Sequence, residues 1–145
     1  MNWRYPLLFC LILALPSFSA AASEGTTSVA VQDAWVREPP PSVAMLAGYM
    51  VLQNQTSQRQ VLVAASSSGF GMVMIHRTVV KNGVASMVHA SQIELAPGAP
   101  LIFAPGGYHL MLMNPKRTLR SGDRVVINLE FRSNPVLPVE FVIRK

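Results

Sequence analysis

Two histidines and two methionines stand at a spacing that could hold a soft metal ion. Ten residues separate His76 from Met87, twenty-one separate Met87 from His109, and one separates His109 from Met111. Imidazole nitrogen and thioether sulfur are neutral donors, and thioethers select Cu(I) over zinc, magnesium or calcium. A neutral donor set also suits a monovalent ion, because the site gains no large residual charge. These four residues therefore define a candidate Cu(I) site.

Other interpretations of the same residues are open. Methionine often fills gaps in hydrophobic cores, and the chain could be an exported interaction domain that binds no metal. A copper-dependent redox enzyme would need an open coordination position and a nearby acid–base group, yet the motif segments contain no Asp or Glu. A blue-copper electron-transfer centre needs a cysteine ligand, and the only cysteine is Cys10, near the N-terminus.

Local β-structure would bring the four side chains together in two pairs. His109 and Met111 are two residues apart on a predicted strand, 108–113, so both point to the same face. The dipeptide Asn82-Gly83 lies between two further predicted strands and favours a hairpin with a two-residue type I′ turn.

The register of this hairpin decides where the other pair lies. With a two-residue turn, Lys81 pairs with Val84, Thr78 with Met87, and His76 with His89. His76 and Met87 are then diagonal neighbours on one face, about 7–8 Å apart at Cα. A three-residue loop would place them on opposite faces.

Four more residues could extend this donor set. On regular strands Met72 and Met74 share a face with His76, and Met113 shares one with His109. We expect these methionines to pack the interior of the domain or surround the site rather than bind metal. We expect His89 to be an exposed strand residue, with the role of a further ligand as the alternative.

The mature chain has the pattern of a protein built from short strands. Turn signals rich in Pro, Gly, Asn and Ser separate the runs, and no window shows a sustained helical stripe. Ten such strands predict an all-β antiparallel sandwich or barrel of Greek-key type. The predicted strands are 29–36, 48–53, 60–65, 72–80, 84–90, 92–95, 100–103, 108–113, 124–131 and 136–143.

The first 22 residues are typical of a secretory signal peptide. Arg4 supplies a positive charge, residues 6–15 are apolar, and small residues follow at 19–22. The apolar stretch is too short to span a bilayer, and the bulky Phe9 makes Cys10 a poor site for lipid attachment. We therefore expect a cleaved signal peptide (1–22), a flexible leader (23–28) and a copper-binding β-sandwich domain (29–145).

Composition narrows the range of partners. The 145 residues carry a net charge of +5, which falls to +4 once Arg4 is removed with the signal peptide. Basic residues are spread along the chain, with no more than two in succession and without interleaved aromatics, which argues against nucleic acid. A mild positive charge suits an acidic partner or an anionic surface. The single cysteine excludes a disulfide scaffold and a cysteine-rich zinc module.

These features together resemble the periplasmic copper chaperones of the PCu(A)C type. The hallmark spacing of that family, H-x10-M-x21-H-x-M, is matched without insertion or deletion, and similar segments lie at 33–37, 39–41, 47–50 and 105–113. The resemblance implies a cupredoxin-like β-sandwich that binds Cu(I) near its surface. The residues that match the family's metal ligands are His76, Met87, His109 and Met111.

The same resemblance implies a cellular role. It indicates a carrier without enzymatic activity that delivers Cu(I) for the assembly of the copper centre of a respiratory (cytochrome c) oxidase. The acceptor would be an oxidase copper-centre subunit or a Sco-type thiol protein. We expect a periplasmic monomer that neither spans the membrane nor binds nucleic acid.

Overall fold

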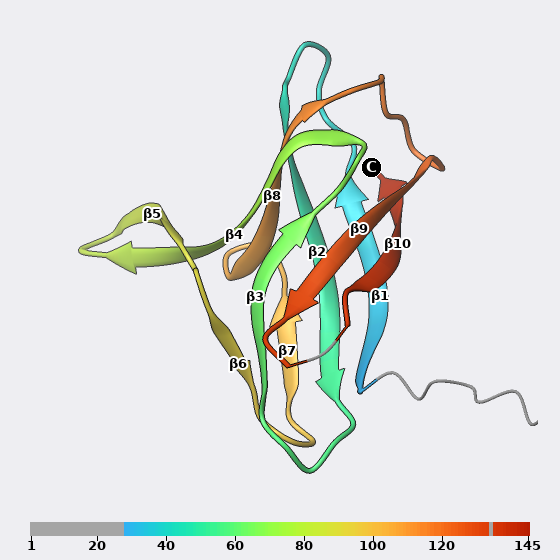
Figure 1. The fold of residues 1–145 in the computed structure, drawn as a ribbon. Coiled ribbons are helices and arrows are strands. Elements are labelled where there is room, and N and C mark those ends of the chain that lie inside the picture. The colour runs from blue at the N-terminus through green and yellow to red at the C-terminus, as the bar shows by residue number, and fades with distance from the viewer. Residues whose placement is uncertain (1–27, 134) are drawn as a thin grey trace, which may run out of the picture.

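Ten strands make up the regular structure of the protein in the residues that the computed structural model describes, 28–133 and 135–145 (Figure 1). They are β1 (Val29–Arg37), β2 (Met45–Asn54), β3 (Gln60–Ser66), β4 (Phe70–Lys81), β5 (Val84–His89), β6 (Ile93–Leu95), β7 (Pro100–Phe103), β8 (Tyr108–Pro115), β9 (Arg124–Phe131) and β10 (Leu137–Arg144). This part of the chain contains no helix that could cross a membrane. The predicted signal peptide, and the predicted leader as far as residue 27, lie outside the described residues.

The strands form one sheet in the order β5-β4-β8-β7-β2-β1-β10-β9-β3-β6, and β8 also pairs with β2. The all-β prediction is confirmed. The sheet is mixed rather than antiparallel throughout, because β1 pairs with β10 and β7 pairs with β8 in parallel. β1 and β10 are far apart in the sequence. β7 and β8 run in the same direction because both pair antiparallel with successive parts of β2, and they meet at one residue pair, Phe103 with Tyr108.

Two strands begin earlier than predicted, and both of these extensions border β8. β2 begins at Met45 rather than residue 48, and its residues 45–48 pair with residues 110–113 of β8. β4 begins at Phe70, which pairs with Pro115 at the end of β8. The extended β2 and β4 therefore flank β8 on both sides.

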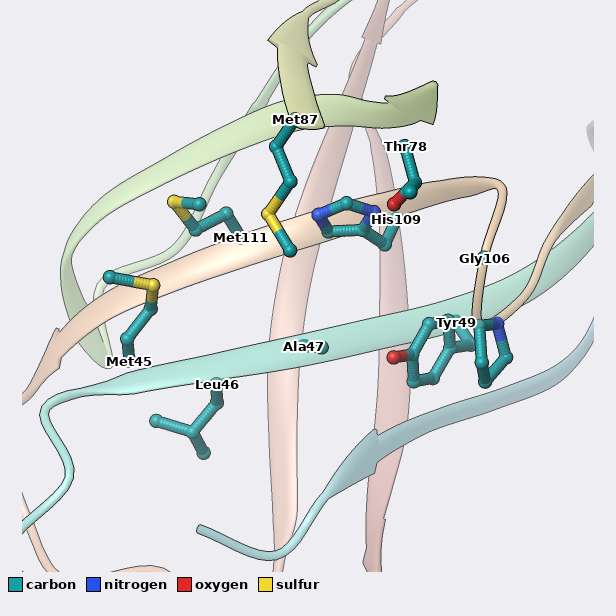
Figure 2. A pocket seen from close by; sticks show the side chains of 10 residues that line it. Met45, Leu46, Ala47, Tyr49, Thr78, Met87, Gly106, His109 and Met111 are labelled. Carbon is teal, nitrogen blue, oxygen red and sulfur yellow. The ribbon is translucent and has the colours of Figure 1, made fainter. Parts of the chain in front are cut away.

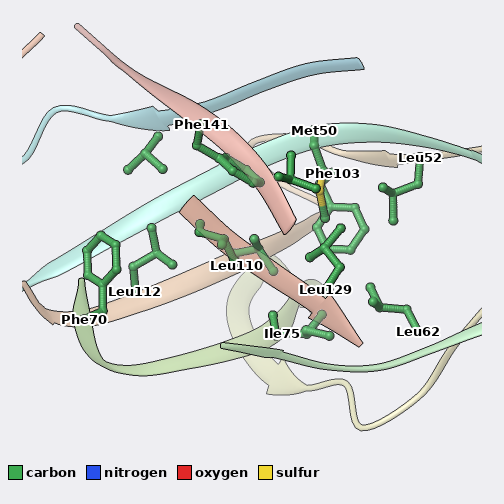
Figure 3. Packing of buried hydrophobic residues seen from close by; sticks show 14 of the residues in the cluster. Met50, Leu52, Leu62, Phe70, Ile75, Phe103, Leu110, Leu112, Leu129 and Phe141 are labelled. Atoms are coloured by element: carbon green, nitrogen blue, oxygen red, sulfur yellow. The ribbon is translucent and has the colours of Figure 1, made fainter. Parts of the chain in front are cut away.

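Apolar side chains from both halves of the folded sheet meet in one core (Figure 3). On β9, for example, the buried residues Ile127, Leu129 and Phe131 alternate with partly exposed ones, as the two-residue period of a strand requires. The fully buried residues include Leu52 of β2, Leu62 of β3, Ile75 of β4, Leu110 of β8, Leu129 of β9 and Phe141 of β10.

The β4–β5 hairpin extends away from this core (Figure 1). Asn82 and Gly83 have positive φ angles of 52° and 76°, as a type I′ turn requires. The predicted register is confirmed: Lys81 pairs with Val84, Thr78 with Met87, and His76 with His89. All six residues of β5 are exposed, so the hairpin presents its side chains to solvent.

Candidate metal centre

The central strand of the candidate site is β8, which carries core residues on one face and donor residues on the other. Leu110 and Leu112 are completely buried. His109 and Met111 alternate with them and therefore point to the opposite face, which we call the outer face. Across from them on β4 lie His76, paired with His109, and Met74, paired with Met111.

A tight turn before β8 fixes the backbone next to His109. The Gly107 amide donates a hydrogen bond to the Ala104 carbonyl at 3.0 Å, and Gly106 between them has a φ of 82°. Proline at the second position and glycine with positive φ at the third are typical of a type II β-turn. The Pro105-Gly106-Gly107 segment thus places the Gly107 carbonyl two residues before His109.

This carbonyl determines which nitrogen of His109 is free to bind a ligand. Nδ1 of His109 lies 3.2 Å from the Gly107 oxygen. Since a carbonyl only accepts hydrogen bonds, Nδ1 must carry the proton, and Nε2 of the neutral ring holds the lone pair. A backbone carbonyl that orients one imidazole nitrogen in this way is a common arrangement behind metal-binding histidines.

The free nitrogen of His109 has no partner, although it is buried. Among the described residues, the buried side-chain polar atoms without a hydrogen-bond partner are His109 Nε2 and His76 Nδ1. The buried Asn54, by contrast, donates to the Gln58 and Leu95 carbonyls and accepts from Thr56. Buried polar groups normally have a hydrogen-bond partner. Two imidazole nitrogens without a partner on the paired strands β4 and β8 therefore indicate a place for a ligand.

A surface pocket of about 220 Å³ opens beside His109. Met87 and Met111 line it together with His109, and Figure 2 shows both thioether side chains beside the imidazole ring. Met87 reaches the pocket from the projecting hairpin and is 60% exposed. The pocket therefore joins donors from β5 and β8.

His76 lies beside this pocket without lining it. Its ring centroid is 5.9 Å from that of His109 and 5.8 Å from that of His89, both in edge-on contact. Burial, followed by the neighbouring His109 and His89 rings, lowers the pKa of His76 below its ordinary value of 6.5. His76 is therefore neutral at pH 7, which is the form of imidazole that binds metal ions.

Histidine and carboxylate side chains alone do not complete a site. In the described part of the chain, no three His, Cys, Asp or Glu side chains are grouped so that they could hold a metal ion. The residues lining the pocket include no carboxylate. A metal here would therefore need the methionine sulfurs, and the neutral surroundings favour a soft monovalent ion.

Two arrangements were expected for the other methionines, packing in the interior or a place around the site, and the structure agrees with the second. Met72 is 50% exposed and Met74 and Met113 are half-buried on the outer face, so none of them packs the interior of the domain. They surround the site instead. The expectation that His89 is an exposed strand residue is confirmed.

The sequence analysis missed Met45, which also lines the pocket. Met45 pairs with Met113 because β2 extends along β8. Its relation to the site depends on this long-range pairing, for which the sequence near residue 45 carries no signal. Thr78 of β4 and Tyr49 of β2 line the pocket as well.

The ten-stranded mixed sheet has a PCuAC-like fold, as comparisons with solved structures show. The fold matches an apo PCuAC domain from PmoF1 with a TM-score of 0.70, at 23% identity over 81% of this chain and 93% of that one. It also matches Cu(I)-bound DR1885 from Deinococcus radiodurans with a TM-score of 0.60, at 31% identity over 87% of this chain and 86% of that one.

The chain belongs to the LpqE-like family, described as "Putative lipoprotein LpqE-like", whose pattern matches residues 29–143. It is 31% identical over 131 residues to "Putative lipoprotein Lxx21020" of Leifsonia xyli subsp. xyli, which covers 90% of this chain and 78% of the relative. It is also 36% identical over 93 residues to the protein RP573 of Rickettsia prowazekii, covering 63% of this chain and 51% of the relative.

Proposed function

We propose that this protein is an exported copper chaperone that binds one Cu(I) ion tightly through His76, Met87, His109 and Met111. It then delivers the ion to an acceptor protein for assembly of a respiratory oxidase copper centre. Copper is the cargo of this protein rather than a resident cofactor. The observation that carries the proposal is the buried, unpartnered Nε2 of His109 beside two thioethers.

The chemistry of the donors supports Cu(I) in particular. The Gly107 carbonyl keeps the proton on Nδ1 of His109, so the lone pair of Nε2 is available without deprotonation. The lowered pKa of His76 keeps that ring neutral as well. Two imidazoles and two thioethers form a neutral, soft set that matches a monovalent ion. The Cu(I) form of DR1885, at 31% identity, supports the same choice of metal.

The position of the site supports release of the ion as well as binding. Met87 is 60% exposed on a projecting hairpin, so an acceptor can reach the metal from solvent. Dinuclear copper centres and Sco-type proteins offer thiolates, which are stronger Cu(I) ligands than thioethers. Transfer to such an acceptor is therefore favourable. Carriage rather than catalysis is also favoured by the pocket lining, which offers no Asp or Glu as an acid or base.

Export is part of the proposal. Arg4, the apolar residues 6–15 and the small residues at 19–22 would direct the chain to the periplasm and allow cleavage. The only cysteine, Cys10, lies within the apolar stretch, so a lipid anchor on it would compete with this cleavage. The mass of the protein recovered from the periplasm distinguishes the two, since cleavage near residue 22 removes Cys10 and lipidation retains it.

Competition for Cu(I) with a chromophoric chelator tests the binding claim. We expect the wild type to bind one equivalent of Cu(I) tightly and His109→Ala to lose this binding. His89→Ala, on β5, is the matched control. Mixing the Cu(I)-loaded protein with a reduced dithiol acceptor tests delivery. Retention of copper by this protein would contradict delivery, and failure of the wild type to compete for Cu(I) would favour a metal-free interaction domain.

A further inference from the structure

The outer face of the sheet around β8 carries three parallel rows of side chains. The first row joins β4 and β8, and the other two also reach β2, because residues directly opposite one another on antiparallel strands share a face. His76 and His109 form the first row, and Met74 and Met111 form the second, which ends at Ala47 on β2. The rows between them face inward and hold core residues such as Leu110 and Leu112.

The third row consists entirely of methionines. Met113 of β8 pairs with Met72 of β4 on one side and with Met45 of β2 on the other. Directly opposed residues in antiparallel strands have Cβ atoms about 4.5–5.5 Å apart. The flexible side chains of Met45 and Met72 can therefore bring their sulfurs to that of Met113.

These methionines are unusually accessible for their type. Met45 is 51% exposed and Met72 is 50% exposed, while Met113 is half-buried between them. An apolar side chain at an exposed position gains little free energy from hydrophobic burial. Burial therefore does not explain why large thioethers occupy positions 45 and 72. Thioether sulfur is, however, a ligand for soft metal ions.

The third row is continuous with the metal pocket. Met45 lines that pocket together with Met111 and with Ala47, the residue opposite Met111 on β2 (Figure 2). Met74 lies opposite Met111 on the other side, on β4. Along β8 the outer-face donors therefore follow one another from Met113 through Met111 to His109.

We propose that Met45, Met72 and Met113 form a second soft-metal site that takes Cu(I), or Ag(I) as its redox-inert analogue, more weakly than the His/Met pocket. Three neutral thioethers without a carboxylate can satisfy a monovalent soft ion and discriminate against zinc, calcium and magnesium. The claim that these three methionines bind metal does not depend on the function proposed for the pocket. A role for them in passing copper through the second row to His109 rests on the function proposed above.

Methyl NMR of the full chain with ¹³C-labelled methionine ε-methyl groups tests this site. We expect the first equivalent of Ag(I) to shift the signals of Met87 and Met111. Further Ag(I) should shift those of Met45, Met72 and Met113. The methyl of Met50, 1% exposed in the core, serves as the internal control and should not move.

Variants distinguish metal binding at this site from metal binding in the pocket. The double variant Met72→Leu and Met113→Leu changes two residues that do not line the pocket, retains apolar volume, and should lose the second binding event while keeping the first. His109→Ala should lose the first event and keep the second, and Met50→Leu should keep both. The proposal is overturned if the methyls of Met45, Met72 and Met113 do not move in excess Ag(I), or if the double variant still binds two ions. The wild-type spectrum decides the question even if the double variant folds poorly.

Discussion

The two faces of β8 differ in what they contribute to the protein. Leu110 and Leu112 face the core with no exposed surface. His109, Met111 and Met113 alternate with them and face the pocket and its surroundings. Because side chains alternate along a strand, residues one position apart serve stability on one side and ligand chemistry on the other. The two properties can therefore be removed separately.

The largest effect on folding should come from the inner face. Leu110→Ala removes a fully buried side chain and leaves a cavity, so we expect a loss of about 2–5 kcal/mol in the free energy of unfolding. Chemical denaturation of the metal-free protein measures it. A loss below about 1 kcal/mol would show that the inner face of β8 is not the core on which the site rests.

The largest effect on binding should come from the outer face of the same strand. His109→Ala removes the nitrogen that the Gly107 carbonyl orients. Loss of a partner that only orients a metal ligand costs about 10–100-fold in affinity, so loss of the ligand itself should cost at least that much. Chelator competition measures the Cu(I) affinity. An affinity within a few-fold of the wild type would remove His109 from the ligand set.

The β4–β5 hairpin allows a further test of whether binding and stability are separable, because Met87 is a proposed ligand outside the core. Met87→Ala should weaken Cu(I) binding and leave the melting temperature of the metal-free protein nearly unchanged, since Met87 is 60% exposed. Val84→Ala is the matched control on the same strand, because Val84 is 68% exposed and points to the opposite face. A marked fall in the melting temperature of metal-free Met87→Ala would assign Met87 to packing.

The smallest expected effect is on the pH dependence of stability. The pKa of His76 is lowered in the folded protein, mainly by burial, relative to about 6.5 in the unfolded chain. The unfolded state therefore binds the proton more tightly. The contribution of His76 to stability is complete above pH 6.5 and is lost as the pH falls through the lower folded-state pKa.

Denaturation of the metal-free protein across this pH range measures the effect. The wild type should lose stability on acidification, and His76→Asn should reduce that slope. Equal slopes in the two proteins would show that His76 titrates at its ordinary pKa.

Local sequence patterns were sufficient to predict how residues of the site that are close in sequence lie relative to one another. The Asn82-Gly83 turn specified the hairpin register, and the two-residue spacing of His109 and Met111 specified their common face. The pairing of β8 with β4 and β2 joins segments far apart in the chain, and no local preference encodes it. For this reason the sequence did not predict that Met45 lines the pocket.

The hydrogen bond from His109 to the Gly107 carbonyl was also beyond sequence reasoning. The Pro105-Gly106-Gly107 segment predicted a turn, but the direction of a single carbonyl depends on the turn type and on the strand that follows. The position of the Gly107 carbonyl oxygen, which orients His109, thus depends on three-dimensional geometry rather than on a motif.

X-ray absorption of the protein loaded with one equivalent of Cu(I) tests the central claim most directly. We expect a spectrum with both nitrogen and sulfur scatterers, from the imidazoles of His76 and His109 and the thioethers of Met87 and Met111. His109→Ala should lose nitrogen scattering, and Met111→Leu should lose sulfur scattering. A spectrum of the wild type with nitrogen or oxygen donors only, or with sulfur donors only, would contradict the assignment of the His/Met pocket as the tight Cu(I) site.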